Sequence, residues 1–221
     1  MTNKLFNVPM PTRAQEIQNK AYDYQVLGFL QCQSNFENLQ DHGYERNTLY
    51  GESFIYFNKL DFGGYGMKNN STFSKKIAKM LKIEDSLIDT EIRFDELIYK
   101  IDFAKDGKYF VTIPQPMLKE LVTCTKSNVI KTYCVLCYML QNGAKQISNI
   151  KLRELTGVSS DNTMDTIIKV LVKLGYIKRT LKPLGKTKIS KDGCRMVEYI
   201  INEYEYTLCS YDEWKQLTNK A

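Results

Sequence analysis

The sequence predicts an α+β protein that is mostly helical, with an N-terminal helical domain at residues 1–113 and a second domain at residues 114–221. Apolar residues recur at helical spacing in several segments, most regularly in the second half. Short aromatic and β-branched segments lie beside Gly, Asp and Pro residues, which is typical of strands and hairpins. Pro114 and Pro116 mark the boundary between the two domains.

The first half predicts an extended arm, two helices and a strand. Residues 1–12 contain two prolines and predict the arm. Helical spacing of apolar residues runs over residues 14–39, and the aromatic segment Glu52–Leu60 suits a strand. Ser71 or Thr72 caps a second helix, which ends near Leu81.

A hairpin is predicted at the end of the first half. Residues 87–99 form a less regular, helix-like stretch. Asp106-Gly107 then separates two strand-like segments, residues 100–104 and 108–113, and such a dipeptide is a strong hairpin signal.

The aromatic residues between 50 and 65 predict a core or a dimer face, with stacking on unpaired bases as the alternative.

The second half begins and ends with a predicted helix. Ser127 is the expected N-cap of the first, over Asn128–Gln141. Residues 176–180 and 196–201 suit two strands joined by a loop that contains Pro and Gly, and the second strand continues toward Tyr206. Tyr211–Leu217 predicts a short closing helix that docks through the chain's one tryptophan.

Two further helices are predicted between these elements, with a tight turn between them. Ser148 caps a short helix over residues 149–155. One of the serines at 159 and 160 caps a longer helix over residues 161–174. Gly157 supplies the positive φ that the turn between them needs.

Positive charge is concentrated in the second half of the chain. The formal net charge is +6. Residues 1–105 hold 13 basic and 14 acidic side chains, whereas residues 106–221 hold 18 basic and 11 acidic ones. Residues 178–195 alone hold seven cations against one acid. This distribution indicates a polyanion partner for the second half.

Residue types that carry chemistry are scarce. The only histidine, His42, falls in a predicted surface loop, so His-pair metal centres are excluded. Gly63–Gly66 lacks the order of a phosphate-binding loop. Cys134 and Cys137 fall inside a predicted helix, so the six cysteines are interpreted as free thiols. We therefore expect no enzymatic activity, catalytic residue, metal or cofactor.

The sequence also predicts where the protein works. No apolar run approaches the roughly 18–20 residues that span a bilayer. The N-terminal residues lack the apolar core of a secretory signal. We expect a cytoplasmic protein with no membrane partner.

Residues 146–179 resemble the winged helix-turn-helix superfamily of DNA-binding proteins. Residues 152–159 (LRELTGVS) are similar to the turn between the superfamily's two helices, and residues 171–177 (LVKLGYI) to the end of its recognition helix. The resemblance covers about residues 113–206. It implies a helix-turn-helix followed by a β-hairpin wing. The helix, helix-like stretch and hairpin of the first half would form a second, degenerate winged helix.

The helix over residues 161–174 would then be the recognition helix, and its length of roughly 21 Å suits a major groove. Its outward side chains would contact bases: Asn162, Thr163, Thr166 and Lys169. Cations of the helix end and the wing would contact phosphates: Lys173, Lys178, Arg179, Lys182, Lys186, Lys188, Lys191 and Arg195. Asp165 would repel phosphate unless it accepts a hydrogen bond from cytosine.

The first half offers one further candidate for DNA contact. A second DNA-facing helix would present three cations: Lys75, Lys76 and Lys79. An ordinary amphipathic helix is the alternative, because acidic residues follow closely.

Two winged-helix-like units in tandem are similar to the initiators of theta-type plasmid and phage replication in low-GC Gram-positive bacteria. Tyr109–Pro114 (YFVTIP), leading into a helix and a winged helix, adds to this resemblance. It implies binding of double-stranded DNA at origin repeats, host replication proteins as partners, and a homodimer as one role of the first domain. The alternatives are a transcription regulator with a palindromic operator and a phage or mobile-element protein-interaction module with no DNA role.

Overall fold

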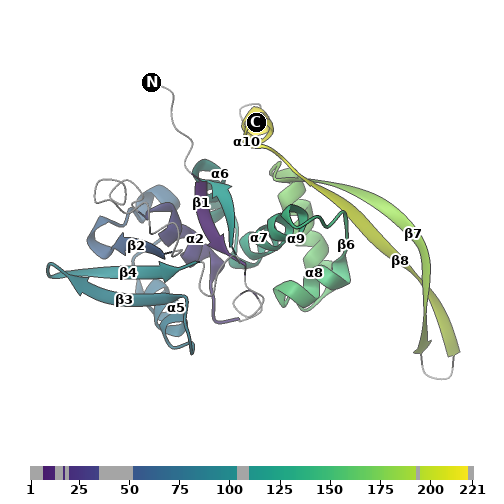
Figure 1. Ribbon diagram of the computed structural model, residues 1–221, viewed down its shortest axis with the longest axis horizontal. Helices are drawn as coiled ribbons and strands as arrows, with labels where there is room; N and C mark the ends of the chain where they lie inside the picture. The colour runs from purple at the N-terminus through teal and green to yellow at the C-terminus, as the bar shows by residue number, and fades with distance from the viewer. Residues whose placement is uncertain are drawn as a thin grey trace. The chain divides into compact units, whose positions relative to one another are not determined.

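The computed structural model shows an α+β chain (Figure 1). In the part that it describes, seven α-helices accompany eight strands, which form three antiparallel sheets. The α+β class predicted from the sequence is therefore confirmed. Side chains are described except within residues 182–203, and the backbone is described over residues 7–12, 17, 20–34, 52–103, 110–192 and 195–218.

The chain divides into two compact units, residues 1–134 (unit 1) and 135–221 (unit 2). The division falls inside helix α7 (Ser127–Gln141), later than the predicted boundary at Pro114. The reason is that the segment around Pro114 joins two elements of the same unit. Strand β5 (Phe110–Pro114) belongs to a sheet of unit 1, and α6 (Gln115–Cys124) packs on another helix of that unit.

The predicted N-terminal arm is a core strand. Strand β1 (Asn7–Pro11) pairs antiparallel with β5, with Val8 opposite Ile113. Val8 and Met10 are buried. The expectation of an arm was wrong because it rested on the two prolines alone. A strand with only one partner leaves a free edge, where a proline need not donate to a neighbour.

The hairpin of unit 1 lies earlier in the chain than the sequence predicted. Strands β3 (Ile88–Arg93) and β4 (Glu96–Asp102) flank a two-residue turn, and β2 (Glu52–Tyr56) pairs with the other edge of β4. The predicted return strand is β5, which pairs with β1 instead. The turn at Asp106-Gly107 lies outside the described residues. The expectation of a helix-like stretch over residues 87–99 was wrong, because these residues form most of the β3–β4 hairpin.

Helices α2 (Tyr24–Cys32) and α5 (Ser71–Leu81) complete the core of unit 1. Asp23 caps α2 and Asn70 caps α5, each accepting two backbone N–H groups, so the expectation that Ser71 or Thr72 caps the second helix was wrong. Helix α2 is shorter than the predicted helix over residues 14–39, whose outer parts lie mostly outside the described residues. At Gly28 it approaches α6 so closely that a Cβ would lie 2.9 Å from Val122.

Part of the aromatic region belongs to the core, around Phe29, whereas Phe54, Tyr56 and Phe57 are half-buried. The Phe29 ring lies within 6 Å, centroid to centroid, of three other aromatic rings: Phe62, Tyr65 and Phe73. Tyr65 and Phe73 are buried. The short 3-10 turn Gly63–Tyr65 carries Tyr65 of this cluster, whereas Phe57 of the other 3-10 turn, Phe57–Lys59, contacts Tyr99. Base stacking is therefore not open to Phe62 and Tyr65, which pack against other rings.

The helices of the second half lie close to their predicted ranges, although Ser127, expected as an N-cap, is the first residue of α7 and its hydroxyl oxygen accepts from the N–H of Tyr24. After α7 come strand β6 (Gln146–Ser148), α8 (Asn149–Thr156) and α9 (Asp161–Lys173). Ser148 accepts from the N–H of Lys151 at the start of α8, and Ser160 from that of Thr163 at the start of α9. Gly157 ends α8 with a φ of 71°.

The sheet of unit 2 has the order β6-β8-β7 and is more extensive than predicted. Strands β7 (Ile177–Asp192) and β8 (Arg195–Leu208) pair along almost their whole length and continue past β6 as a two-stranded ribbon (Figure 1). The region predicted as a loop is strand because Pro183 and Gly185 mark only an irregularity in the ladder, between Pro183 and Thr187. A bulge tolerates such residues without ending the pairing.

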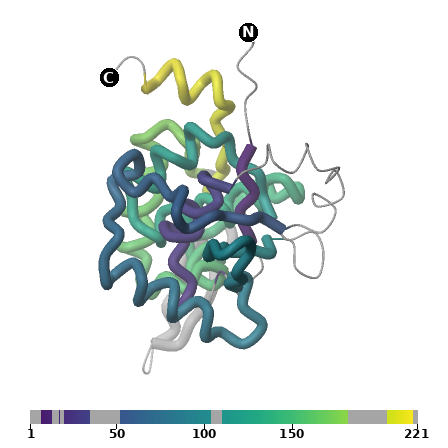
Figure 2. The backbone as a smooth tube through the Cα atoms, turned by 90° about the vertical axis from the view of Figure 1, so that its left-hand side faces the viewer, coloured from purple at the N-terminus to yellow at the C-terminus, as the bar shows by residue number. Residues whose placement is uncertain are grey.

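The closing helix α10 (Tyr211–Thr218) docks as predicted (yellow in Figure 2). Trp214 is buried, with its ring centroid 6.3 Å from that of Tyr176. None of the helices in the described residues is long and apolar enough to cross a membrane.

Candidate nucleic-acid interface

Helix α9 presents one apolar and one polar face. Met164, Ile168 and Leu171 are buried, as the helical period predicts. The residues predicted to face DNA are all exposed: Asn162, Thr163, Thr166, Lys169 and Lys173. The outer face therefore carries two cations, an amide and two hydroxyls.

The threonines of this face are oriented by local hydrogen bonds. The Thr163 and Ser160 hydroxyl oxygens lie 2.8 Å apart. The Thr166 hydroxyl donates to the backbone oxygen of Asn162 at 2.9 Å. Because its proton is engaged in the helix, Thr166 offers a methyl group and oxygen lone pairs to a partner.

Asp165 is paired within the protein. Its Oδ1 lies 3.1 Å from the Arg179 Nη1 and accepts from the Asn149 Nδ2 at 3.1 Å. One carboxylate therefore links α8, α9 and β7. Its negative charge is compensated by a neighbouring cation, so it repels an approaching phosphate far less than the sequence suggested.

Arg179, predicted to contact phosphate, lies inward. Its side chain is 15% exposed, and its guanidinium lies 3.5 Å from the ring centroid of Tyr204 on β8. Burial raises the pKa of neighbouring Tyr206 to about 12, so its phenol stays neutral. The ion pair of Arg179 and Asp165 leaves this cluster with no net charge. Its contribution is to fix α9 against the hairpin.

Lys178 is exposed but carries an internal partner. Its Nζ lies 2.7 Å from the Glu213 Oε1 on α10. Hydrogen bonds from Lys178 and Ser210 lower the pKa of Glu213 to about 2, and Glu213 in turn raises the pKa of Lys178. Since both side chains are largely exposed, this pair can open when a phosphate competes.

The remaining predicted phosphate contacts lie on the ribbon of β7 and β8. The backbone register places Lys182 opposite Glu203, Lys188 opposite Tyr199 and Lys191 opposite Met196. Lys186 falls in the irregular part of the ladder, and Arg195 begins β8. Their side chains lie outside the described ones. The backbone therefore places four of these five cations on β7 and one at the start of β8.

Arg153 is a structural residue of the site that the sequence prediction missed. It donates from Nη2 to the Ser159 carbonyl at 2.8 Å and lies 3.1 Å from the Asp161 carboxylate through Nη1. It therefore braces the turn between α8 and α9. Its place in the last turn of a helix that ends at a glycine was the available signal, because side chains there can reach a following turn.

The candidate second face in unit 1 is mixed in charge. Lys75 and Lys79 on α5 are exposed, whereas Lys76 lies 2.8 Å from the Asp23 carboxylate. The hairpin that follows, residues 88–102, holds five acids and two bases. Its acidic charge is opposite to what a phosphate-binding hairpin needs.

Neither the cysteines nor the acidic residues form a metal site in the described part of the chain. None of the five described cysteines forms a disulfide, and four of these are buried: Cys32, Cys134, Cys137 and Cys209. Burial raises the pKa of the Cys32 thiol to about 12, which keeps it protonated. His42 lies outside the described residues.

Comparison with known proteins finds no relative of this chain. No protein-family model, curated protein or solved structure matches this chain.

Proposed function

We propose that the chain is a double-stranded DNA-binding protein of the winged helix-turn-helix class. The support is the order of elements in unit 2: a helix, a short strand, two helices around a tight turn, and a hairpin, with sheet order β6-β8-β7. In that class the second helix of the turn, here α9, enters the major groove, and the hairpin lies beside it. The protein binds DNA without acting as an enzyme.

One observation carries the proposal. The exposed face of α9 is polar to basic, and residues 178–195 of the ribbon that follows hold seven cations against one acid. Arg179 is turned inward, so six of these cations remain as candidates for phosphate. The two acids of α9 that weigh against DNA binding are both paired, Asp165 with Arg179 and Asp161 with Arg153. Asn162 and Lys169 suit base edges, and the ribbon suits the flanking phosphates.

The element order of unit 1 supports a tandem arrangement. Helix α2, strand β2, helix α5 and the β3–β4 hairpin follow one another, and the sheet order β2-β4-β3 repeats that of unit 2. Two such units favour an initiator of plasmid or phage replication that binds repeated sites at an origin in the cytoplasm. Host replication proteins would be its further partners.

A transcription regulator is the second candidate, favoured by the acidic hairpin of unit 1. A hairpin with five acids and two bases suits a protein contact better than phosphate. Unit 1 would then dimerise, and the operator would be palindromic. Selection of bound sequences from a random pool separates the two, because a regulator predicts half-sites about 34–36 Å apart and an initiator predicts direct repeats.

Binding to random duplex DNA across salt concentrations tests the DNA role itself. Each phosphate contact contributes a slope of about 0.9 in log K against log salt. We expect the double variant Lys186→Ala/Lys188→Ala to reduce the slope by the contribution of about two phosphate contacts. Lys126→Ala, an exposed cation of unit 1, serves as control and leaves the slope unchanged. A flat salt dependence of the natural chain would instead support the interaction module without a DNA role.

A further inference from the structure

Three exposed apolar side chains gather at the tip of the β3–β4 hairpin. Phe94 is 93% exposed, Ile92 76% and Leu97 40%. Ile92 and Leu97 are directly opposite each other in the ladder, and Phe94 is in the turn beside them. Single exposed apolar residues are ordinary, whereas a cluster on one projecting element indicates a contact surface.

The backbone of this turn supports the same conclusion. Phe94 and Asp95 have φ values of 50° and 63°, in the left-handed region. A two-residue turn of this kind favours Asn-Gly, because a bulky side chain is strained at positive φ. An aromatic residue held there in solvent contributes nothing to the core of unit 1. A partner that covers the Phe94 ring would account for its presence.

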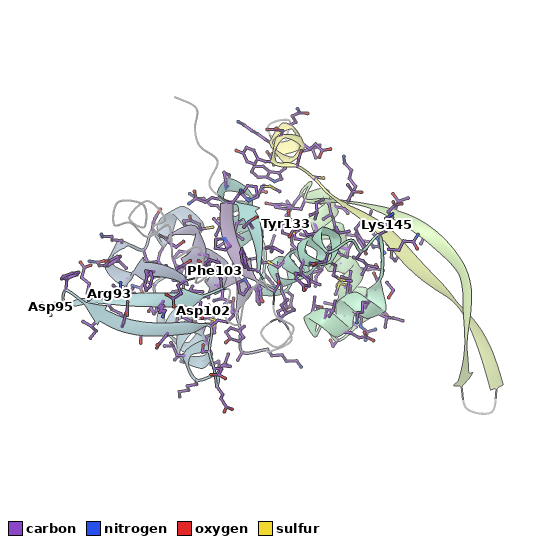
Figure 3. The ribbon with its side chains drawn as sticks, in the orientation of Figure 1. Arg93, Asp95, Asp102, Phe103, Tyr133 and Lys145 are labelled. Atoms are coloured by element: carbon purple, nitrogen blue, oxygen red, sulfur yellow. The ribbon has the colours of Figure 1, made fainter. Side chains whose placement is uncertain are left out.

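The charge of the hairpin excludes DNA as that partner. Residues 88–102 hold five acids and two bases. Figure 3 shows Arg93 and Asp95 at the outer end of the hairpin. A phosphate backbone would meet net negative charge around the apolar tip, so the partner is a protein surface.

Strand β3 offers a free edge beside the apolar tip. It is the outer strand of the β2-β4-β3 sheet, and no other described strand pairs with it. The N–H of Asp102 donates to the oxygen of Leu87 at 2.8 Å. Bonded and non-bonded pairs alternate in an antiparallel ladder, so the backbone groups of Ile88, Thr90 and Ile92 point to the outer edge. The N–H groups of Ile88 and Thr90 donate there to the Ser86 Oγ and the Asp89 Oδ1, so the pairing proposed below is centred on Ile92.

We propose that β3 pairs antiparallel with β3 of a second copy of this chain, with the two-fold axis at Ile92. Glu91 then lies opposite Arg93 of the second copy, and Arg93 opposite Glu91, so the strand is complementary to itself. Opposite charges at paired positions stabilise a ladder. The exposed Ile92 side chains of the two copies meet at the axis, next to Phe94 and Leu97.

Neighbouring registers are disfavoured by charge. An axis at Glu91 places two glutamates opposite each other, and an axis at Thr90 places Glu91 opposite Asp89 twice. Within one copy, Arg93 already pairs with Glu91 and lies 4.6 Å from the Phe54 ring centroid. In the dimer, Arg93 can pair with Glu91 of the second copy in place of its own Glu91. Each copy therefore replaces one ion pair by an equivalent one.

The test is the oligomeric state of the full chain without DNA, measured by sedimentation over a range of concentrations. The natural chain is expected to dimerise. Glu91→Arg and Arg93→Glu are each expected to weaken the dimer about tenfold or more, because two attractive pairs become repulsive. An equimolar mixture of the two variants should restore it as a heterodimer, since each Arg then faces a Glu.

Glu84→Arg, an exposed acid outside the hairpin, is the matched control and should leave the dimer intact. Phe94→Asn removes the exposed ring, so it should weaken the dimer. Asparagine tolerates the positive φ of this turn, so the folded chain should stay as stable as before. A monomeric natural chain, or a mixture of the charge variants that stays monomeric, would overturn the proposal. Since DNA is absent, either result leaves the DNA-binding proposal untouched.

Discussion

The Asp165 carboxylate on α9 and the Arg179 guanidinium on β7 form an ion pair of 3.1 Å. The pair joins the proposed recognition helix to the root of the ribbon, and the arginine is held further by the ring of Tyr204. A cation that the sequence suggested for phosphate is thus used to set the position of the helix. This assignment is open to a direct test.

Replacement of Arg179 should change DNA affinity without changing its salt dependence. Arg179→Met leaves Asp165 without its cation, so we expect a loss of about 1–3 kcal/mol in the free energy of unfolding. DNA affinity should fall because Asp165 then repels phosphate, while the slope of log K against log salt stays the same. Denaturant unfolding and salt titrations measure the two effects.

The double variant Asp165→Asn/Arg179→Met provides the control. It removes the uncompensated charge and should recover much of the lost affinity. A slope that drops by about 0.9 in Arg179→Met alone would show that this arginine contacts phosphate after all.

Asn162 should contribute to sequence preference rather than to overall affinity. It is exposed near the start of α9, and an asparagine can bond adenine through two hydrogen bonds. Asn162→Ala is expected to cost about 1–3 kcal/mol of discrimination at one base pair and to leave the salt slope unchanged. Selection of bound sequences measures this, with Asn128→Ala on α7 as control. Equal losses on selected and random DNA would place Asn162 away from base edges.

The sequence predicted the parts of the fold that depend on nearby residues. Ser148, Gly157 and Ser160 fix the ends of α8 and α9 through contacts within three or four positions, and all three act as expected. The pairing of β1 with β5 joins segments about a hundred residues apart, and no local pattern specifies such a partner. The inward position of Arg179 escaped prediction for the same reason, since its partners come from other elements.

The N-cap of α9 makes a measurable contribution to stability. The Ser160 hydroxyl oxygen accepts from the N–H of Thr163 at 3.2 Å. Ser160→Ala should lower the free energy of unfolding by about 1 kcal/mol, because that N–H loses its acceptor. Ser159→Ala is the matched control, since only the backbone oxygen of Ser159 takes part in the turn. Equal destabilisation by both variants would show that Ser160 acts otherwise than as a cap.

The docking of α10 should depend on pH through Glu213. Its pKa is lowered from 4.5 to about 2 by hydrogen bonds from Lys178 and Ser210. A carboxylate with a lowered pKa stabilises the fold fully above its unfolded value, and this contribution is lost as the pH falls through about 2. Trp214, the only tryptophan, is buried one residue away and reports the change through its fluorescence.

We expect a fluorescence transition of Trp214 between pH values of about 4.5 and 2 in the natural chain. Glu213→Gln cannot ionise, so this transition should disappear while other acid transitions remain. Asp212→Asn, an exposed acid in the same helical turn, should keep it. If Glu213→Gln shows the same transition as the natural chain, Glu213 does not hold α10 in place. The Lys178 side chain would then need no exchange of partners before it contacts phosphate.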